Sequence, residues 1–256
     1  MRYLEAKPHF TLRDWVKCYW FMEKDYAGQG EAETIFPDGC IDLLLNAGNA
    51  FHPYPTSVLI GPLNQALSLP ANGKALIIGI RFYAYGIYPF LREPLHELTN
   101  QAIDAKLLFG ATTSELTEKV MQSNPQAAFK LLDTFLLARL GENHNDTQMV
   151  KATMPLLWQL SPIKDVAKQV YIGSRSLERK FKQVTGFSPK MLARVLRFNR
   201  LKNDLMLHPG QNLTDLAHRH LYFDQAHFNH DFHQFTGQTP SQFVREVENG
   251  TIRFYR

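Results

Sequence analysis

The sequence predicts an α+β protein with a β-rich, barrel-like N-terminal domain and an all-α C-terminal domain. Between about Phe10 and Phe82, apolar runs are bounded by Gly, Pro or Asn, as in strands. After Gly86 the apolar residues recur at helical spacing. At 256 residues the chain is long enough to bury a core without disulfides, and Cys18 and Cys40 are its only cysteines. We therefore expect two domains in a reducing compartment.

The N-terminal domain is expected to cover residues 1–141. The predicted strands are WVKCYWFM, CIDLLLN after the turn at Pro37-Asp38-Gly39, SVLIGP and ALIIGIRF. A helix from Pro125, with Asn124 as its N-cap, is expected to close the domain. Its apolar face is Ala128, Leu131, Leu132, Phe135 and Leu136. Residues 142–152 are predicted as a polar linker, residues 153–249 as the helical domain and residues 250–256 as a tail.

The positive charge lies in the C-terminal part. Residues 1–154 hold 13 Lys and Arg against 16 Asp and Glu, whereas residues 155–249 hold 13 against 8. From Lys164 to Lys202 there are 11 basic residues and only two acidic ones, Asp165 and Glu178. A solvated helix face normally mixes the two signs. This density therefore favours a polyanion partner, duplex DNA.

The C-terminal half contains a degenerate internal repeat. VAKQVYIGSRSLERKFKQVTGFSP aligns with LAHRHLYFDQAHFNHDFHQFTGQTP at an offset of 50 residues, which becomes 51 after the first helix. Each copy has a short helix with a small Ala, a tight turn and a second helix with one apolar stripe, the pattern of a helix-turn-helix unit. The stripes are Leu177, Phe181 and Val184 in the first copy, and Phe228, Phe232 and Phe235 in the second. A helix from Pro189, capped by Ser188, to about Leu207 joins the copies.

These motifs resemble the paired helix-turn-helix domain of AraC/XylS regulators over residues 163–243. The hallmarks are the repeat offset, GFSPK and GQTPSQF after each second helix, and YFDQAHF. PHFTLRDWVKCYW, PDGCIDLLLN and IGIRFYAYG are similar to segments found with it in that family. The resemblance implies a cupin-like sensor or dimerisation module at the N-terminus. It also implies that the two second helices enter successive major-groove segments about one turn, roughly 34 Å, apart.

The resemblance assigns two sets of contact residues. Base-facing side chains are expected to be Arg175, Glu178, Arg179, Gln225, His227, Asn229 and His230. Contacts to the DNA backbone are expected from Ser174, Lys182, Ser188, Lys190 and His233.

Two departures from the family pattern concern the turns and the charge. Tyr171 and Leu221 stand where the family usually has a turn glycine, so either Gly173 takes part of that role in a shifted turn or packing absorbs the strain. Residues 203–249 hold two basic and six acidic residues beside six histidines. We infer that the first unit supplies most of the phosphate attraction and that the second adjusts specificity, with a pH dependence from its histidines.

An effector pocket in the N-terminal domain is the second expected site. Its candidate residues are Trp20, Asp38, Cys40, Arg81, Tyr83, Tyr85 and Tyr88. Barrel packing is an equally good interpretation of the aromatic members, and a buried small hydrophobe is the commoner role of a lone cysteine such as Cys40. Histidines 227, 230 and 233 lie on neighbouring helical turns, but no Cys or carboxylate at suitable spacing completes a metal site.

Sequence-specific control of transcription is thus the predicted function, without cofactor or metal. No phosphate loop, Gly-x-Ser-x-Gly or HExxH motif appears. The alternatives are an N-terminal enzymatic domain fused to a DNA-targeting domain, and a purely structural dimeriser. The predicted partners are double-stranded DNA, a small-molecule effector and RNA polymerase, with the chain as monomer or homodimer. No membrane span or signal peptide is predicted, so we expect a cytoplasmic protein. The operator and the direction of regulation are not encoded in these patterns.

Overall fold

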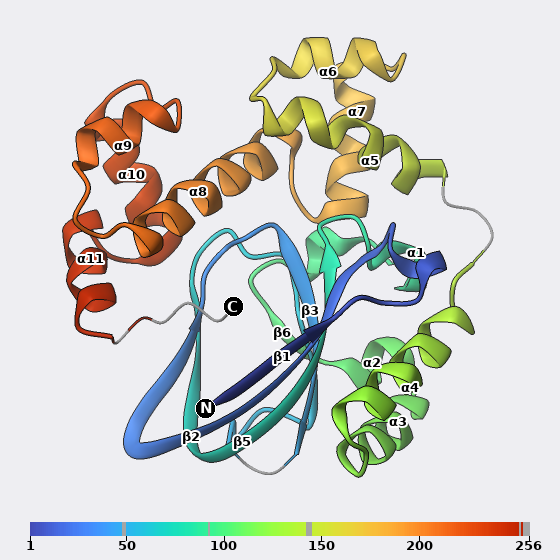
Figure 1. Cartoon of the computed structure of the whole chain (residues 1–256). Coiled ribbons are helices and arrows are strands. Elements are labelled where there is room, and N and C mark those ends of the chain that lie inside the picture. The colour runs from blue at the N-terminus through green and yellow to red at the C-terminus, as the bar shows by residue number, and fades with distance from the viewer. Residues whose placement is uncertain (48–49, 92, 142–144, 251, 253–256) are drawn as a thin grey trace.

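One curved, antiparallel sheet forms the frame of the N-terminal domain (Figure 1). The computed structural model describes residues 1–47, 50–91, 93–141, 145–250 and 252. Its six strands follow the order β1-β2-β5-β3-β4-β6, with β1 and β6 at the edges. The strands are β1 (Arg2–Ala6), β2 (Val16–Ile35), β3 (Cys40–Ala47), β4 (Ser57–Ile60), β5 (Leu67–Tyr83) and β6 (Ala102–Asp104).

The strands β2 and β5 pair along almost their whole length, from Val16 opposite Phe82 to Ile35 opposite Leu67. The predicted strands lie within β2 to β5, which confirms the β-rich domain. Sequence patterns missed β1, β6 and the far half of the β2–β5 pair. Such segments are held in extended form by their neighbours rather than by an apolar run of their own.

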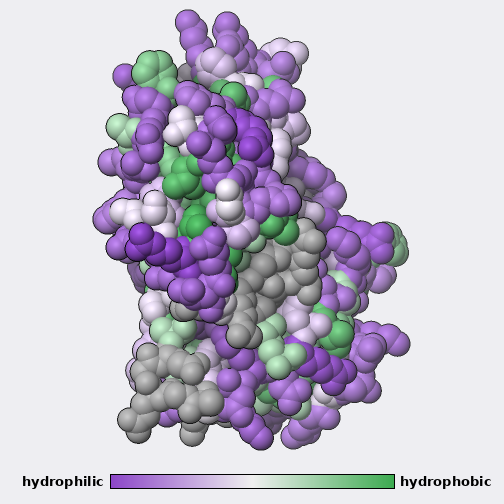
Figure 2. Space-filling view, turned by 60° about the vertical axis from the view of Figure 1, so that its left-hand side comes forward, coloured by the Kyte–Doolittle hydropathy of each residue, from purple (hydrophilic) through white to green (hydrophobic). Residues whose placement is uncertain are grey.

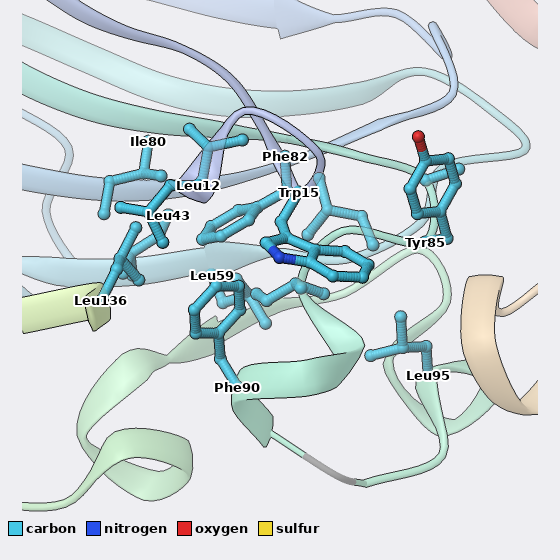
Figure 3. Close-up of a cluster of buried hydrophobic side chains, with 14 of the residues drawn as sticks. Leu12, Trp15, Leu43, Leu59, Ile80, Phe82, Tyr85, Phe90, Leu95 and Leu136 are labelled. Atoms are coloured by element: carbon cyan, nitrogen blue, oxygen red, sulfur yellow. The ribbon is translucent and has the colours of Figure 1, made fainter. Parts of the chain in front are cut away.

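Alternation along the strands gives the sheet two distinct faces. On the face toward the helices, Tyr19, Leu43, Ile80 and Phe82 belong to the largest apolar cluster. Figure 3 shows the last three of them within this cluster. The other face carries a smaller cluster that includes Trp20, Met22 and Ile77. We call this second face the concave face. In register, the row Cys18, Arg81 and Asp42 is followed by the row Trp20, Gly79 and Leu44.

Short helices cover the face of the sheet that is opposite the concave face. These are η1 (Phe10–Leu12), α1 (Tyr88–Leu91), η2 (Leu95–Leu98), α2 (Ala105–Phe109), α3 (Thr112–Met121) and α4 (Pro125–Leu137). Asn124 caps α4 by accepting a hydrogen bond from the Ala127 amide at 3.0 Å, as predicted. Ala128, Leu132 and Leu136 of α4 are buried in the cluster. The predicted closing helix is therefore confirmed.

The expected linker is corrected over most of its length. Residues 142–144 lie outside the described residues, and the helix α5 (Asn145–Trp158) occupies the rest. Thr147, Val150, Thr153 and Leu157 form its buried face. The hydroxyl of Thr153 donates to the Val150 carbonyl at 2.6 Å, which satisfies it inside the core. Because threonine reads as polar in the sequence, this buried helical face was not recognised.

Two helix-turn-helix units and a connector follow α5. The first unit is α6 (Ile163–Gln169) and α7 (Ser174–Thr185), the connector is α8 (Pro189–Leu207), and the second unit is α9 (Leu213–Arg219) and α10 (Gln225–Thr236), followed by α11 (Pro240–Glu248). With 19 residues, α8 is about 28 Å long. It spans the distance between the units (Figure 1). The all-α C-terminal domain is thus confirmed.

The two units are packed differently. Leu177, Phe181 and Val184 of the first unit belong to the same apolar cluster as the sheet. Phe228, Phe232 and Phe235 of the second unit form a separate core with α8 and α11. The first unit is therefore continuous with the N-terminal core, whereas the second has a core of its own.

Both turns adopt the left-handed conformation without glycine. Tyr171 has φ +55° and Leu221 has φ +60°, whereas Gly173 has φ −72°, so the turn is not shifted. In the first unit the amides of Tyr171 and Ile172 donate to the carbonyls of Lys168 and Ala167, at 3.1 and 3.2 Å. The second unit repeats this pattern, which is a Schellman motif. Hydrogen bonds of the motif hold the strained residue in each turn.

Replacing Leu221 by glycine is therefore expected to stabilise the protein by about 0.5–1 kcal/mol, because glycine removes the left-handed strain. The Leu221 side chain is mostly exposed, so little packing is lost. Urea denaturation of both proteins measures the difference. The matched control is Phe223→Gly, which removes an exposed apolar side chain from a neighbouring position without positive φ and should destabilise. Equal destabilisation by both changes would contradict the strain argument.

Within the described part of the chain, no helix is long and apolar enough to cross a membrane. Figure 2 turns the side of the second unit forward and shows a surface that is mainly hydrophilic, with hydrophobic side chains gathered in a few places.

Candidate nucleic-acid interface and ligand cavity

The helix α7 presents one polar side to solvent. Its apolar residues are buried, and Arg175, Glu178, Arg179 and Lys182 are exposed together on another side. This is the spacing of side chains that share a helix face. The predicted contact residues of the first unit are thus brought together by α7.

Bonds at its half-buried positions hold α7 in place. Lys180 forms an ion pair with Asp146 of α5. Gln183 Nε2 donates to the hydroxyl of Tyr88 in the N-terminal domain. Gly186, at φ +76°, ends the helix where a Cβ would lie only 2.6 Å from Pro62. The helix is therefore fixed against both α5 and the N-terminal domain.

The exposed side of α7 forms one wall of a crevice of about 470 Å³. The other wall is formed by Pro94, the N-cap of η2, and by His96 within η2. Arg175, Glu178, Arg179, Lys182 and Gln183 line the α7 side. The N-terminal domain therefore lies beside the predicted contact face of the first unit.

The helix α10 has the equivalent face in the second unit. Gln225, Asn229, His230 and His233 are exposed on it. At the offset of 51, Arg175 corresponds to Ala226, which is also exposed and was not predicted. The repeat offset, applied to every position of α7, would have identified it.

His227 is the half-buried member of the set predicted on α10, and its base-facing role stays a prediction. Its Nε2 lies 3.1 Å from Nη2 of Arg197 on α8. Because arginine only donates, His227 Nε2 is the acceptor. The sequence does not show which residues of α8 reach α10, so this contact with Arg197 was not expected.

Asp231 joins α10 to the connector helix. It is 1% exposed, and its carboxylate accepts from Arg194 Nη2 at 2.6 Å and Arg197 Nη2 at 2.8 Å. Burial alone would raise the pKa of Asp231, but the hydrogen bonds from Arg194 and Arg197 outweigh it and hold the pKa below its usual value. We call these three residues the Asp231 clamp.

Arg197 extends the clamp to the turn of the second unit. Its Nη1 donates to the Leu221 carbonyl at 3.3 Å, and its guanidinium stands 3.9 Å from the ring centroid of Tyr222. The residue thus contacts the strained turn as well as α10. The first unit is joined to the start of α8. The clamp therefore sets how the exposed polar face of α10 is oriented relative to that of α7.

The expected backbone contacts lie at helix ends and on the exposed faces. Ser174 is the first residue of α7 and is exposed, as is Lys190 near the start of α8. The Ser188 hydroxyl caps α8 and accepts from the Met191 amide at 3.2 Å. The predicted cap is confirmed, and the roles of these residues toward DNA stay predictions.

A cavity of about 440 Å³ lies between the concave face and the second unit. Of the predicted pocket residues, Trp20, Asp38 and Arg81 line it. Further lining residues from the sheet domain are Tyr3, Lys24, Glu33, Phe36, Asp42, Asn46, Phe51 and Tyr54. From α8, α11 and their surroundings come Lys202, Met206, Thr236, Gln238, Glu246 and Ile252.

Trp20 forms part of the sheet wall because its neighbour is a glycine. A Cβ on Gly79 would lie 2.1 Å from Trp20 Cε2, so the indole lies flat against the strand there. Trp20 Nε1 donates to Asp42 Oδ1 at 3.1 Å, and Arg81 Nε donates to the same oxygen at 3.0 Å. Arg81 Nη1 also lies 3.6 Å from Asp38 Oδ2. The polar side of the wall is thus one connected network.

Charges of both domains meet at Asp38. Burial would raise its pKa, but Arg81 and then Lys202 outweigh this effect and lower it. The pKa of Lys202 is lowered chiefly by burial, against the opposing effect of Asp38. Asn199 of α8 donates to the Asp38 carbonyl at 3.3 Å. The Pro37–Gly39 turn is therefore the point where the sheet meets the connector helix.

The other four predicted pocket residues do not line this cavity, which corrects that part of the prediction. Cys40 and Tyr83 pair at the strand ends beyond it. After Tyr83 the chain turns toward the opposite face, where Tyr85 is buried and Tyr88 packs against the large cluster. Burial, and next the Asp38 charge, raise the pKa of Cys40 to about 12, so its thiol stays protonated near neutral pH.

Several lining residues were missed by the sequence patterns. Asp42 and Asn46 lie four residues apart in CIDLLLN, so they share one face of the strand, and this even spacing was a usable signal. For Lys202 and Glu246 the sequence held no usable signal, because no local pattern shows which helix covers a sheet. Among the residues that the structure describes, no three His, Cys, Asp or Glu side chains gather in a way that would hold a metal ion.

Comparison with known proteins agrees with this geometry. Residues 166–246 match a family described as a helix-turn-helix domain, and residues 4–104 match a domain of unknown function, DUF6597. The HTH-type transcriptional activator RhaS of Shigella boydii is 31% identical over 88 residues, which are 34% of this chain and 31% of that protein. The match thus spans under a third of the relative's length.

Two solved structures of ToxT from Vibrio cholerae are also similar in arrangement. One has a TM-score of 0.47 at 11% identity and covers 89% of this chain and 98% of that one. The other, described as bound to an unsaturated fatty acid, has a TM-score of 0.43 at 11% identity and covers 88% and 94%.

The matched residues and the paired units define a class: the C-terminal part of this chain is a helix-turn-helix domain, a DNA-binding module. The two units on one connector helix and the match to RhaS confirm that this domain resembles the paired helix-turn-helix domain of AraC/XylS regulators.

Proposed function

We propose that the chain is a sequence-specific, DNA-binding transcription regulator whose residues 1–141 act as a sensing domain. The observation that carries the proposal is the pair of exposed polar faces, at equivalent positions on α7 and α10, held on one connector helix. Helices of this kind read base edges in the major groove. Because both units belong to one chain, a monomer is able to span two half-sites.

The proposed reading groups differ between the units. In the first unit, Arg175 and Arg179 are each able to donate two hydrogen bonds to a guanine. Glu178 is able to accept a hydrogen bond from the amino group of a cytosine. In the second, Gln225 and Asn229 suit adenine, His230 is a further donor, and the Ala226 methyl suits the thymine methyl. His227 also supports the helix through its contact with Arg197.

The crevice beside α7 bears on how DNA reaches the first unit. Pro94 and His96 stand opposite the proposed reading residues. A duplex that seats α7 in its major groove needs the space on this side of the helix. We infer that the first unit and the N-terminal domain move apart at this crevice when DNA binds.

Selection of random duplexes with the purified chain tests the proposed function. We expect enrichment of a bipartite motif with half-sites about one helical turn apart, roughly 34 Å. Affinity for the selected duplex should fall steeply as salt rises, because phosphate contacts release counterions. A single undivided motif would contradict reading by two units, and failure to enrich any motif would remove the proposal of sequence-specific binding.

Lys182 and His233 occupy equivalent positions, so they test how the two units share the phosphate contacts. We expect Lys182→Ala to weaken binding of the selected duplex and to reduce the slope of log affinity against log salt by about one. The His233→Ala change should have a smaller effect, since an imidazole attracts phosphate less strongly than an ammonium group does. Salt titrations of both variants measure this. Equal losses would show that the first unit does not supply most of the attraction.

A further inference from the structure

We propose that the cavity between the concave face and the second unit binds an organic cation with a flat aromatic body, and that the bound molecule bridges the two domains. The inference rests on the proposed regulator function, since it names the ligand class of the sensing domain. Three properties of the cavity support this inference: its aromatic walls, its excess of carboxylates and the fact that both domains contribute lining residues.

The walls suit a flat ring. Tyr3, Trp20, Phe36, Phe51 and Tyr54 line the cavity. The Trp20 indole lies along the strand in the space at Gly79 and stacks with the Tyr3 ring at 6.3 Å between centroids, so the two rings together form an aromatic wall of the cavity. Ring faces also attract cations. A volume of about 440 Å³ accommodates a two-ring molecule with water to spare.

The charged side chains leave one carboxylate for the ligand. Glu33 is paired with Lys24 at 2.7 Å, and Asp42 and Asp38 share Arg81. Among the residues that the structure describes, Glu246 has no basic side chain within 4.0 Å, and Gln238 Nε2 donates to it at 3.1 Å. Four carboxylates thus line the cavity against three cations. The third cation, Lys202, interacts electrostatically with the half-buried Asp38.

The lining comes from both domains. Trp20 and its aromatic neighbours belong to the sheet domain, whereas Lys202 and Met206 belong to α8 and Glu246 to α11. A cation that stacks on Trp20 and pairs with Glu246 therefore ties the second unit to the sheet. Since the Asp231 clamp joins α10 to α8, such a ligand shifts the orientation of the second reading face and hence the affinity for spaced half-sites.

Three probes of equal ring size test the ligand class on the full chain: naphthylmethylamine, naphthylmethanol and naphthoate, titrated by calorimetry. We expect the amine to bind at least about tenfold more tightly than the alcohol, and naphthoate to bind most weakly. The Glu246→Gln variant should lose the preference for the amine over the alcohol. Glu248→Gln, on an exposed position of the same helix that does not line the cavity, is the matched control and should keep it.

The proposal is overturned if naphthoate binds as tightly as the amine, if no probe binds at millimolar concentration, or if Glu246→Gln keeps the preference. DNA binding of the unliganded chain is measured separately on the selected duplex. Loss of DNA binding with intact amine binding would reject the regulator function and leave the cavity site standing. Intact DNA binding without amine binding would reject only the ligand class.

Discussion

Replacing Asp231 by alanine is expected to lower the free energy of unfolding of the second unit by about 3 kcal/mol. The change leaves the guanidinium groups of Arg194 and Arg197 without their buried partner, and breaking a buried ion pair from one side typically costs about 3–5 kcal/mol. Arg194 is partly exposed and regains some hydration, which places the value at the lower end. Urea denaturation at neutral pH measures the loss. The matched control, Asp215→Ala on an exposed position of α9, should change stability by less than about 0.5 kcal/mol.

The same residue sets a pH dependence with a definite sign. The folded-state pKa of Asp231 is lowered, so its stabilising effect is present above the unfolded value of about 3.9 and is lost as the pH falls through the folded value. The stability difference between the natural protein and Asp231→Ala should therefore shrink below about pH 4. A difference that stays constant down to pH 2 would show that the ionised carboxylate is not what holds α10.

Removing Arg179 is expected to weaken binding to the selected duplex by about 10–100-fold, corresponding to about 1–3 kcal/mol, and to relax the preference at one base pair. The side chain is exposed on α7 and the guanidinium is able to donate two hydrogen bonds to one guanine. Binding of Arg179→Ala to the selected duplex and to its single-base variants measures both effects.

Two further variants serve as comparisons for Arg179→Ala. His230→Ala, at the equivalent position of the second unit, should cost less because an imidazole makes one bond where arginine makes two. Lys168→Ala removes an exposed cation of α6 that pairs with Asp165, and should leave base preference unchanged. If Arg179→Ala lowers affinity equally for every sequence, Arg179 contacts the backbone and not a base.

The sequence by itself determined the parts that local chemistry encodes. The caps at Asn124 and Ser188 need only a side-chain oxygen and an amide three residues away, and both form as predicted. The apolar stripes of α7 and α10 repeat every three or four residues, so the two units are visible without any knowledge of their neighbours. The exposed polar faces follow directly, since they are the sides of α7 and α10 that the apolar stripes do not occupy.

The tertiary structure decided what depends on contacts between distant segments. His227 accepts a hydrogen bond from Arg197, because α10 packs on α8 at the Asp231 clamp. Tyr171 and Leu221 keep the left-handed turn without glycine, because the Schellman bonds close on carbonyls of the preceding helices. The cavity joins Trp20 on one strand to Glu246 more than two hundred residues later. Such contacts between distant segments depend on the burial and charge of whole packed surfaces. A short stretch of sequence does not contain that information.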